Sequence, residues 1–491
     1  VYTNAWSKLA IGKCRYGLML NEDGMVYDDG VTTRLGENHY IMTTTTGGAA
    51  NVMGKLEDYL QTEWPELDVY LTSVTDHFAT VSVCGPNSKK IVSEVIPDLD
   101  FTPKQMRAWV IRKERHGEPT KSFQEEIMPV PECGPNDVLV LVVATGINFN
   151  GVWAGLGEPI SVLDVHKGDF HIAGSDCSGI VWDVGSNVKS WKKGDEVIIH
   201  CGVESEEPHS NMTQSNADFI SYDPMVSKGA QIWGYETPNG CFAQFTRVQA
   251  QQILKKPKHL SWEDAASYAL CYFTAYRMLV TKANIQPGEV VLVWGAAGGL
   301  GVFALQICKM MGAKAIAVVS SNDKFKMCED LGAVGVINRK DFPNLPYKKN
   351  ETEEESQLRF KEMKNFGKKI WEILGERRSP NVVFEHPGET TFPASVFVCE
   401  RFGRVVICAG TTGYDCMFDV RYLWMLQKDV IGSHFANALE CVRANELVHQ
   451  GLINPVVSEI FNYDEIPKAH QLMYENKHSG KMVCMVQGTK P

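Results

Sequence analysis

The chain has 491 residues, which is too long for one typical domain and predicts two to four. Hydrophobic residues make up 44% of it and charged residues 22%, which is the composition of a globular protein. No run of about 18 apolar residues occurs, so we expect no membrane span. A formal net charge of −11 argues against nucleic acid as a partner.

Residues 1–98 form the first predicted unit, with the pattern of a small α+β domain. Its expected elements are three strands, a helix, a fourth strand and a short helix, over residues 16–20, 25–34, 39–45, 49–64, 69–84 and 87–95. Asp28 and Asp29 lie in the second of these strands. One of them would hold an amine or a pterin if this unit binds a ligand, whereas surface carboxylates that cap a turn explain the same spacing.

A polar, proline-flanked segment, in which residues 99–105 are taken as a linker, leads into a series of short strands with glycine turns. These strands are predicted over residues 107–112, 123–129, 137–146, 173–185 and 193–200. Short strands at this spacing indicate a small β-barrel. The polar stretch 202–231 predicts a surface loop. Near the end of the chain, a helix over 466–475 precedes a strand over 481–487 that would rejoin the barrel.

The stretch 290–308 has the pattern of a strand, a glycine turn and a helix. Residues 290–294 form a short apolar run without alternation, which suits a parallel strand buried on both faces. Glycines let the backbone approach a ligand closely, and free amides at the start of a helix favour an anionic diphosphate. A second βα unit follows at 313–321, so the stretch favours a dinucleotide site over a tight turn without a ligand. The expected cofactor-binding residues are Gly295, Ala297, Gly298, Gly299, Leu300 and Gly301.

The order of a barrel, a βαβ unit and a C-terminal return to the barrel is that of medium-chain dehydrogenases/reductases. Further buried strands are predicted over 381–385, 403–408 and 429–434. We therefore expect an α/β fold, in which a GroES-like β-barrel catalytic domain spans 106–260 plus 438–491. The Rossmann domain, with its parallel sheet, would span 261–437.

The end of the second Rossmann strand decides between NAD and NADP. NAD-binding proteins usually place an acid there to hold the ribose 2′-hydroxyl. This chain has Ser320, Ser321 and Lys324, which can hold a 2′-phosphate, and Arg339 can add a charge-assisted bond. Asp323 argues mildly for NAD, but it lies beyond the serines. The pattern favours NADPH.

No metal site is expected from the sequence. Zinc alcohol dehydrogenases carry Gly-His-Glu on a barrel strand where this chain has Gly174-Ser175-Asp176, and their four-cysteine lobe is missing. The 14 cysteines are scattered and form no CxxC pair, so we expect reduced thiols. The first residues lack the pattern of a signal peptide, and we expect a cytoplasmic protein. Without a Lewis acid, the acceptor must take a hydride without polarisation by metal, as an enoyl thioester or a quinone does.

Six long motifs resemble crotonyl-CoA carboxylase/reductase, and the resemblance runs over essentially all of 106–491. They lie at residues 146–159, 232–240, 383–389, 405–413, 421–425 and 432–436. The resemblance implies that NADPH delivers a hydride to the β-carbon of an enoyl-CoA of the crotonyl-CoA type. The resulting enolate attacks CO2 and gives an alkylmalonyl-CoA such as ethylmalonyl-CoA. A non-carboxylating enoyl-CoA reductase is the alternative.

The resemblance also implies roles for individual residues. Asn150, Glu236 and His434 would hold CO2, helped by a backbone amide at Tyr235, while Arg421 and Tyr422 would contact CoA. Without the motifs around them, the same residue types are explained by a turn-forming Asn, a core His and an ion pair at a helix start. The family further implies a homo-oligomer, a dimer or tetramer built through the dinucleotide domains.

A second resemblance covers the N-terminal unit. Residues 15–40 are similar to the folate-binding aminomethyltransferase domain of sarcosine oxidase. That domain is several times longer than 1–98, so this unit is expected to be a part of it. A folate-dependent aminomethyl-transfer module, an interaction module and a remnant without activity all remain open.

Overall fold

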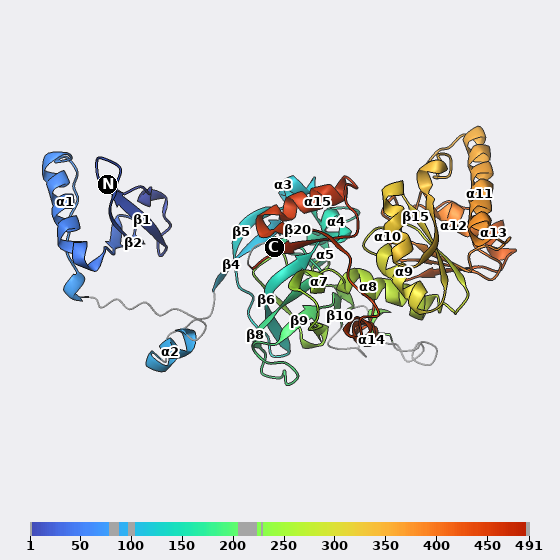
Figure 1. Ribbon diagram of the computed structural model, residues 1–491, viewed down its shortest axis with the longest axis horizontal. Coiled ribbons are helices and arrows are strands. Elements are labelled where there is room, and N and C mark those ends of the chain that lie inside the picture. The colour runs from blue at the N-terminus through green and yellow to red at the C-terminus, as the bar shows by residue number, and fades with distance from the viewer. Residues whose placement is uncertain (1, 78–87, 97–103, 205–222, 227–228, 488–491) are drawn as a thin grey trace. The chain divides into compact units, whose positions relative to one another are not determined.

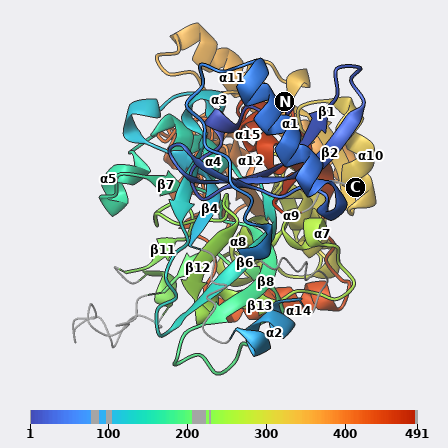
Figure 2. The ribbon, with the colours of Figure 1, turned by 90° about the vertical axis from the view of Figure 1, so that its left-hand side faces the viewer.

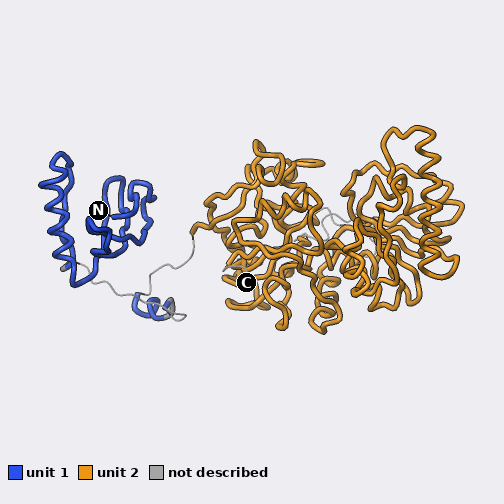
Figure 3. The backbone as a smooth tube through the Cα atoms, turned by 45° about the horizontal axis from the view of Figure 1, so that its top comes forward, with its two compact units in different colours: residues 1–101 blue, residues 102–491 orange. Residues whose placement is uncertain are grey.

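The structure, a computed structural model, describes residues 2–77, 88–96, 104–204, 223–226 and 229–487 (Figure 1). The chain forms two compact units, residues 1–101 and 102–491 (Figure 3). The predicted linker lies almost entirely outside the described residues, and the domain boundaries within 106–491 stay a prediction.

The first unit contains an antiparallel sheet and two helices, as predicted. Strands β1 (Cys14–Leu20), β2 (Val26–Gly36) and β3 (His39–Met42) pair in that order, and helices α1 (Ala49–Thr62) and α2 (Ser88–Val95) follow. The strand predicted over 69–84 is wrong in its described part, residues 69–77, which contain only a short 3-10 turn (Thr75–His77). Tyr70 is 90% exposed, so these apolar residues lack the covering surface that a strand needs. Residues 78–84 lie outside the described residues.

The second unit begins with the barrel. In its described residues the main sheet has the order β13-β9-β8-β6-β21-β20, with β12 also paired to β6, and a smaller sheet has the order β5-β4-β7. Figure 2 shows β12, β6 and β8 next to one another. The strands are β4 (Gln105–Ile111), β5 (Gln124–Pro129), β6 (Asp137–Gly146), β7 (His171–Ile172), β8 (Cys177–Val184), β9 (Glu196–Ile199), β12 (Phe245–Gln249), β13 (Ile253–Lys255), β20 (Val457–Asn462) and β21 (Lys481–Met485).

The closing strand rejoins the barrel, as predicted from the sequence. Strand β21 runs antiparallel to β6, with Val483 opposite Gly146. This return brings the last described residues of the chain next to residues of the first barrel strands. Short helices cover this region, namely α3 (Pro119–Ser122), α4 (Phe149–Leu156), α5 (Val162–His166) and α15 (Ile466–Tyr474).

Of the predicted surface loop at 202–231, the structure describes residues 202–204, 223–226 and 229–231. There β10 (Gly202–Val203) pairs antiparallel with β11 (Gln231–Ile232). Residues 205–222 and 227–228, which form most of the predicted loop, lie outside the described residues.

The dinucleotide domain contains a parallel sheet, which in the described residues has the order β16-β15-β14-β17-β18-β19. Its strands are β14 (Val290–Val293), β15 (Lys314–Val319), β16 (Ala333–Asn338), β17 (Val382–Glu385), β18 (Arg404–Ile407) and β19 (Asp429–Gly432). The order reverses between β14 and β17, and doubly wound sheets bind ligands beyond the carboxyl ends of the strands at such a reversal. The fold therefore places a site after residue 293.

Strand β14 is buried on both faces, as its unbroken apolar run predicts. Val290 and Leu292 pack into one apolar cluster and Val291 and Val293 into another. Helices cover the two faces: α9 (Gly301–Met310), α10 (Phe325–Asp330), α11 (Glu353–Leu374), α12 (Phe392–Val398) and α13 (Arg421–Trp424). Further helices, α7 (Trp262–Ala265), α8 (Ala269–Tyr276) and α14 (Ala438–His449), lie next to the barrel.

Candidate functional site

The glycine turn between β14 and α9 is built so that only glycine fits at two positions. Gly295 has φ +56°, which side chains rarely adopt, and a Cβ there would lie 2.6 Å from His386 Nε2. A Cβ on Gly301 would lie 2.4 Å from Ala296 Cα and 2.5 Å from the carbonyl oxygen of Gly295, both backbone atoms. At these two positions the backbone of the turn therefore carries no side chain, at the carboxyl end of β14.

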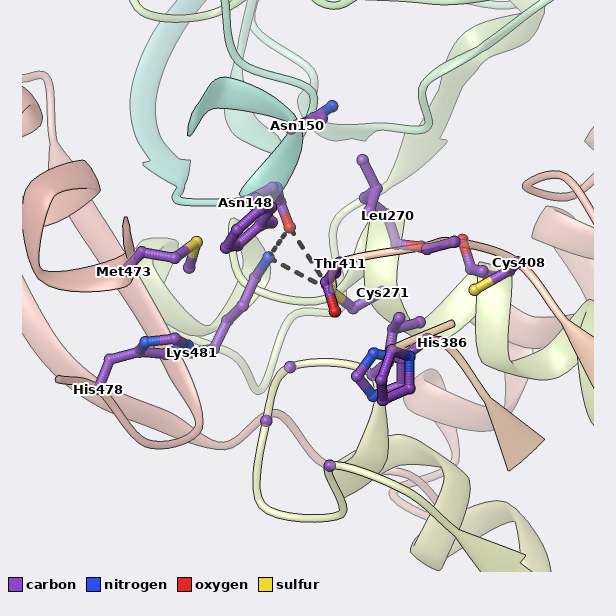
Figure 4. Close-up of a pocket in the computed structure, with 18 of the residues that line it drawn as sticks. Asn148, Asn150, Leu270, Cys271, His386, Cys408, Thr411, Met473, His478 and Lys481 are labelled. Carbon is purple, nitrogen blue, oxygen red and sulfur yellow. Dashed lines mark hydrogen bonds between the residues drawn. The ribbon is translucent and has the colours of Figure 1, made fainter. Parts of the chain in front are cut away.

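A cavity of about 530 Å³ opens at this turn (Figure 4). The barrel supplies one wall and the dinucleotide domain the other. Of the predicted cofactor residues, those that border the cavity are Gly295, Ala297, Gly298, Gly299, Leu300, Ser320, Lys324 and Arg339. Gly301 lies behind the turn as the first residue of α9.

A second hollow adjoins the first at the end of β15. Ser320, Ser321, Lys324 and Arg339 border it together, so the structure brings the four predicted 2′-phosphate residues to one place. The Lys324 ammonium lies 3.4 Å from Ser320 Oγ. Asp323, the residue that argued for NAD, is bonded to Ser321, and this bond lowers the pKa of its carboxyl.

The residues expected to hold CO2 come from three segments of the chain. Asn150 on α4, Tyr235 after β11 and His434 after β19 all border the cavity. The Asn150 side-chain amide donates to Ser175 Oγ at 2.9 Å, which fixes its orientation and leaves its second N–H free for a ligand. Burial, then Tyr414 and Glu236, raise the pKa of the Tyr235 phenol to about 12, so at neutral pH it is a hydrogen-bond donor.

Glu236 is not among the described residues that border the cavity. Its carboxylate accepts a hydrogen bond from the Ile232 amide at 2.7 Å. The amides of Tyr235 and Glu236 both donate to the Ile232 carbonyl oxygen, at 3.1 and 2.7 Å. The Tyr235 amide, which the resemblance implies helps to hold CO2, is therefore bonded within the turn in this structure. In this structure Glu236 therefore shapes the turn that presents Tyr235.

The two predicted CoA residues lie outside the cavity. The Arg421 guanidinium is exposed and makes a forked pair with Asp419, with Nε 2.9 Å from Oδ1 and Nη2 2.6 Å from Oδ2. The Tyr422 ring packs edge-on against Phe397, with centroids 4.9 Å apart. These contacts match the ion pair at a helix start, and the CoA role stays a prediction.

Three residues at the cavity were not predicted from the sequence. The buried Lys481 of β21 pairs with Asp176 at 2.8 Å. His478 borders both hollows, and burial, then Lys324 and Lys481, lower its pKa to about 4, so its ring is neutral at pH 7. His386 contacts the Trp294 carbonyl oxygen at 3.1 Å. His386 lies in the motif at 383–389, and a run of polar residues just before the closing strand was the sequence signal for His478 and Lys481.

Asp28 in the first unit is 5% exposed and is therefore not a surface carboxylate. Its Oδ1 accepts a hydrogen bond from the Thr45 amide at 3.0 Å, as in the capping interpretation, whereas its Oδ2 has no hydrogen-bond partner among the described residues, as in the ligand interpretation. Asp29 accepts a hydrogen bond from the Tyr16 hydroxyl.

A buried carboxyl lies next to the cavity wall, beside His386. Glu385, at the end of β17, is fully buried and accepts hydrogen bonds from the Gly388 amide and the hydroxyls of Thr391 and Ser395. Burial raises its pKa from 4.5 to about 7, and the hydrogen bonds only partly oppose this rise. The group holds the loop that leads from His386 to the cavity rim.

This carboxyl predicts a pH dependence of stability. Because the pKa of Glu385 is higher in the folded than in the unfolded chain, the native state binds more protons than the unfolded state between pH 4.5 and 7. The contribution of Glu385 to the free energy of unfolding therefore falls as the pH rises through that window. Glu385→Gln should remove this dependence, on the order of 3 kcal/mol between the two ends. Denaturant unfolding at pH 5 and pH 8 measures it. Glu376→Gln, at an exposed carboxylate, is the control, and equal pH slopes for Glu385→Gln and wild type would contradict the assignment.

Comparison with known proteins identifies the family. A crotonyl-CoA carboxylase/reductase of Cereibacter sphaeroides is 52% identical over 410 residues, which cover 82% of this chain and 93% of that relative. The chain belongs to the crotonyl-CoA carboxylase/reductase family. Within this family, the solved structure of crotonyl-CoA carboxylase/reductase AntE in complex with NADP is 42% identical, covers 80% of this chain and 97% of that one, and has a TM-score of 0.74. The structure of the 2-octenoyl-CoA carboxylase reductase CinF in complex with NADP and 2-octenoyl-CoA is 35% identical over 79% of this chain and 90% of that one, with a TM-score of 0.71.

Family patterns confirm the medium-chain reductase architecture around the crotonyl-CoA carboxylase/reductase site. The alcohol dehydrogenase GroES-like domain matches residues 134–258 and the zinc-binding dehydrogenase pattern matches residues 299–450. The GCVT N-terminal domain matches residues 1–118. Sarcosine oxidase subunit alpha of Rhizobium meliloti is 54% identical over 105 residues, 21% of this chain and 11% of that relative. Three interpretations of residues 1–98 were left open, namely a folate-dependent module, an interaction module and a remnant without activity; calorimetry of the whole chain with tetrahydrofolate tests the first.

The zinc-binding dehydrogenase pattern implies a metal, but this chain's residues do not fit one as they are placed, with the Lys481 ammonium against Asp176. In the described ranges, no group of three or more His, Cys, Asp or Glu is placed to hold one. Asp176, in the segment where zinc alcohol dehydrogenases carry Gly-His-Glu, is bonded to the Lys481 ammonium instead. We therefore derive no step through a metal.

Proposed function

We propose that the chain catalyses the NADPH-dependent reductive carboxylation of an enoyl-CoA of the crotonyl-CoA type to an alkylmalonyl-CoA. The observation that carries this proposal is the convergence of Asn150, Tyr235 and His434 on the cavity that opens at the glycine turn. NADPH, when bound, supplies the hydride that adds to the β-carbon of the substrate. The α-carbon of the resulting enolate then attacks the carbon of CO2, one C–O π bond opens, and a carboxylate forms.

The chain's own residues act on CO2 and on water. CO2 is neutral and weakly bound, so it needs donors aimed at the oxygens on which negative charge develops. The Asn150 amide and the Tyr235 phenol are such donors, and His434 adds a ring nitrogen from the opposite wall. The site must also exclude water, because a proton taken up by the enolate gives plain reduction. Apolar side chains supply this part of the wall: Ile147, Phe149, Trp153, Leu270 and Phe435.

The proposal is tested by the bicarbonate dependence of cofactor consumption. NADPH oxidation is followed by absorbance with crotonyl-CoA, with and without bicarbonate and carbonic anhydrase. We expect bicarbonate to accelerate the reaction and one acid group to appear per NADPH. Oxidation at the same rate, with no acid group formed, would indicate the non-carboxylating reductase.

The hollow at the end of β15 predicts selectivity for NADPH over NADH. A charge-assisted bond to phosphate is worth roughly 1.5–3 kcal/mol, so Lys324→Ala and Arg339→Ala should each weaken NADPH about 10- to 100-fold. NADH lacks the 2′-phosphate and should bind these variants as it binds wild type. Fluorescence titration with both cofactors measures the two dissociation constants. Lys326→Ala is the matched control, because its ammonium pairs with Asp330 on the surface, and equal losses for both cofactors would count against the assignment.

We propose that the protein is a homo-oligomer that pairs through the β19 edge of the dinucleotide sheet. Strand β19 ends the described sheet order, so one row of its backbone groups lacks a partner strand in that sheet. Next to it, Trp424 is 64% exposed, and Met417, Val420, Met425 and Val430 are exposed as well. A second copy placed edge to edge would cover both features in a closed twofold contact.

Light scattering tests this interface. Trp424→Glu should lower the molar mass of the assembly toward that of one chain, because burying a carboxylate in an apolar contact is costly. Val334→Glu is the matched control, since Val334 is an exposed residue on β16 at the opposite sheet edge. A mass that drops only for the Val334 variant would place the interface at the other edge.

None of the helices in the described ranges is long and apolar enough to cross a bilayer. The cytoplasmic location expected from the sequence stays a prediction.

A further inference from the structure

A buried lysine closes one end of the cavity. Lys481, the first residue of β21, is 1% exposed, and its side chain reaches toward Asn148 and Cys271 (Figure 4). Its ammonium lies 2.8 Å from Asp176 Oδ2, 3.1 Å from the Ile147 carbonyl oxygen and 3.5 Å from Cys271 Sγ, and it donates to Asn148 Oδ1. Four acceptor atoms from three segments thus surround one cation.

Two of these acceptors, Asp176 and Asn148, are held in place by other bonds. Asp176 is fully buried, and its second oxygen accepts a hydrogen bond from the Leu270 amide at 2.6 Å. The Asn148 amide nitrogen donates to Asp176 Oδ2 at 2.9 Å, which turns the amide oxygen toward the ammonium. The cation site is therefore built by the fold and does not depend on a flexible side chain.

The charge of Lys481 is kept despite its burial. Its ammonium makes an ion pair with the Asp176 carboxylate at 2.8 Å, and both side chains are almost fully buried. An ammonium without such partners would be too costly to bury.

The donor set is one that proteins use for divalent metals. A carboxylate, an amide oxygen, a backbone carbonyl and a cysteine sulfur are all metal ligands, and four ligands suit a tetrahedral ion. Asp176 belongs to the segment in which zinc alcohol dehydrogenases carry Gly-His-Glu. Where such a family would hold a metal, this chain holds its own ammonium.

We propose that the ammonium of Lys481 is the resident cation of this site, that it excludes divalent metals, and that removing the side chain leaves a latent metal site formed by Asp176, Asn148, Ile147 and Cys271. In that latent site the Cys271 sulfur binds the metal as thiolate and its proton goes to solvent. This inference concerns cation binding alone and does not rest on the carboxylation reaction.

The cation site lies directly under the glycine turn. A Cβ on Gly299 would lie 3.1 Å from Cys271 Sγ and 3.5 Å from Lys481 Cδ. The Gly480 amide donates to the Ala297 carbonyl oxygen at 2.9 Å, which ties the strand carrying Lys481 to the turn. The lysine thus positions the barrel against the cofactor-binding backbone, so that its loss also affects cofactor binding.

Cobalt titration tests the proposal on the whole chain. Wild type should retain no Co²⁺ after gel filtration. Lys481→Ala should retain one equivalent and show the near-ultraviolet charge-transfer band of a cobalt–thiolate bond. Lys481→Ala combined with Cys271→Ser should lose that band. The matched control is Lys256→Ala, at another buried lysine. The Lys256 ammonium contacts the Leu260 carbonyl oxygen at 2.7 Å and Glu196 at 3.5 Å, and its contacts include no thiol. This variant should show no charge-transfer band.

A second measurement covers the case in which Lys481→Ala folds poorly. Methylammonium or Zn²⁺ should raise the unfolding temperature or refolding yield of this variant and leave wild type and Lys256→Ala unchanged. Rescue by either cation supports the site. Cobalt binding to wild type through Cys271, or a Lys481→Ala variant that neither binds cobalt nor responds to either cation, would overturn the proposal.

Discussion

Asn150→Ala is expected to separate hydride transfer from carboxylation. The Asn150 amide is held by Ser175 at 2.9 Å and borders the cavity, so it is placed to donate to CO2. Removing one preorganised donor to a developing charge costs about 10²- to 10³-fold. We expect incorporation of CO2 to fall by about this factor, while NADPH oxidation falls much less because the enolate takes up a proton instead.

The product ratio measures this effect. Mass analysis of the acyl-CoA products gives the fraction carboxylated for wild type and variant at equal NADPH consumption. Asn187→Ala is the control, because Asn187 lies near the surface and bonds only to Asn136 Oδ1 at 2.9 Å through its side chain. An unchanged ratio in Asn150→Ala would remove this residue from the CO2 site.

Gly301→Ala is expected to abolish cofactor binding at the glycine turn. Its Cβ would lie 2.4 Å from Ala296 Cα, and backbone atoms cannot move aside as the end of a flexible side chain can. Overpacking of this kind costs about 1–3 kcal/mol, and opening the turn also misplaces the amides that would face the diphosphate. We expect NADPH to bind at least about 100-fold more weakly in fluorescence titration, which corresponds to roughly 3 kcal/mol.

Gly367→Ala is the matched control for this change. Gly367 lies inside α11, and a Cβ there meets nothing within 4 Å. Alanine in a helix interior is better than glycine by about 0.5–1 kcal/mol, so this variant should be slightly more stable and bind NADPH as wild type does. Equal NADPH affinity for the two variants would show that cofactor binding does not require a residue without a side chain at position 301.

The parts of the fold and site that the sequence predicted are those encoded by local patterns. The apolar run of β14, the glycines after it and the Ser–Lys pair after β15 are neighbours in sequence, and the structure keeps them together around one cavity.

The parts that were missed depend on contacts between distant segments. Lys481 meets Asp176 only because β21 returns to β6, and an isolated lysine in a closing strand gives no sign of such a partner. The strand predicted at 69–84 is wrong over the described residues 69–77, because a sequence pattern does not reveal whether a neighbouring strand exists. Glu236 shares a motif with Tyr235, yet the turn directs its carboxylate to a backbone amide, which spacing does not encode.

The most direct test of the account is the mass of the product made from crotonyl-CoA, NADPH and ¹³C-bicarbonate with carbonic anhydrase in deuterated water. We predict one ¹³C-carboxyl group per NADPH oxidised, as ethylmalonyl-CoA. A saturated acyl-CoA that carries deuterium at the α-carbon and no ¹³C would contradict the account and show that the enolate meets a solvent proton instead of CO2.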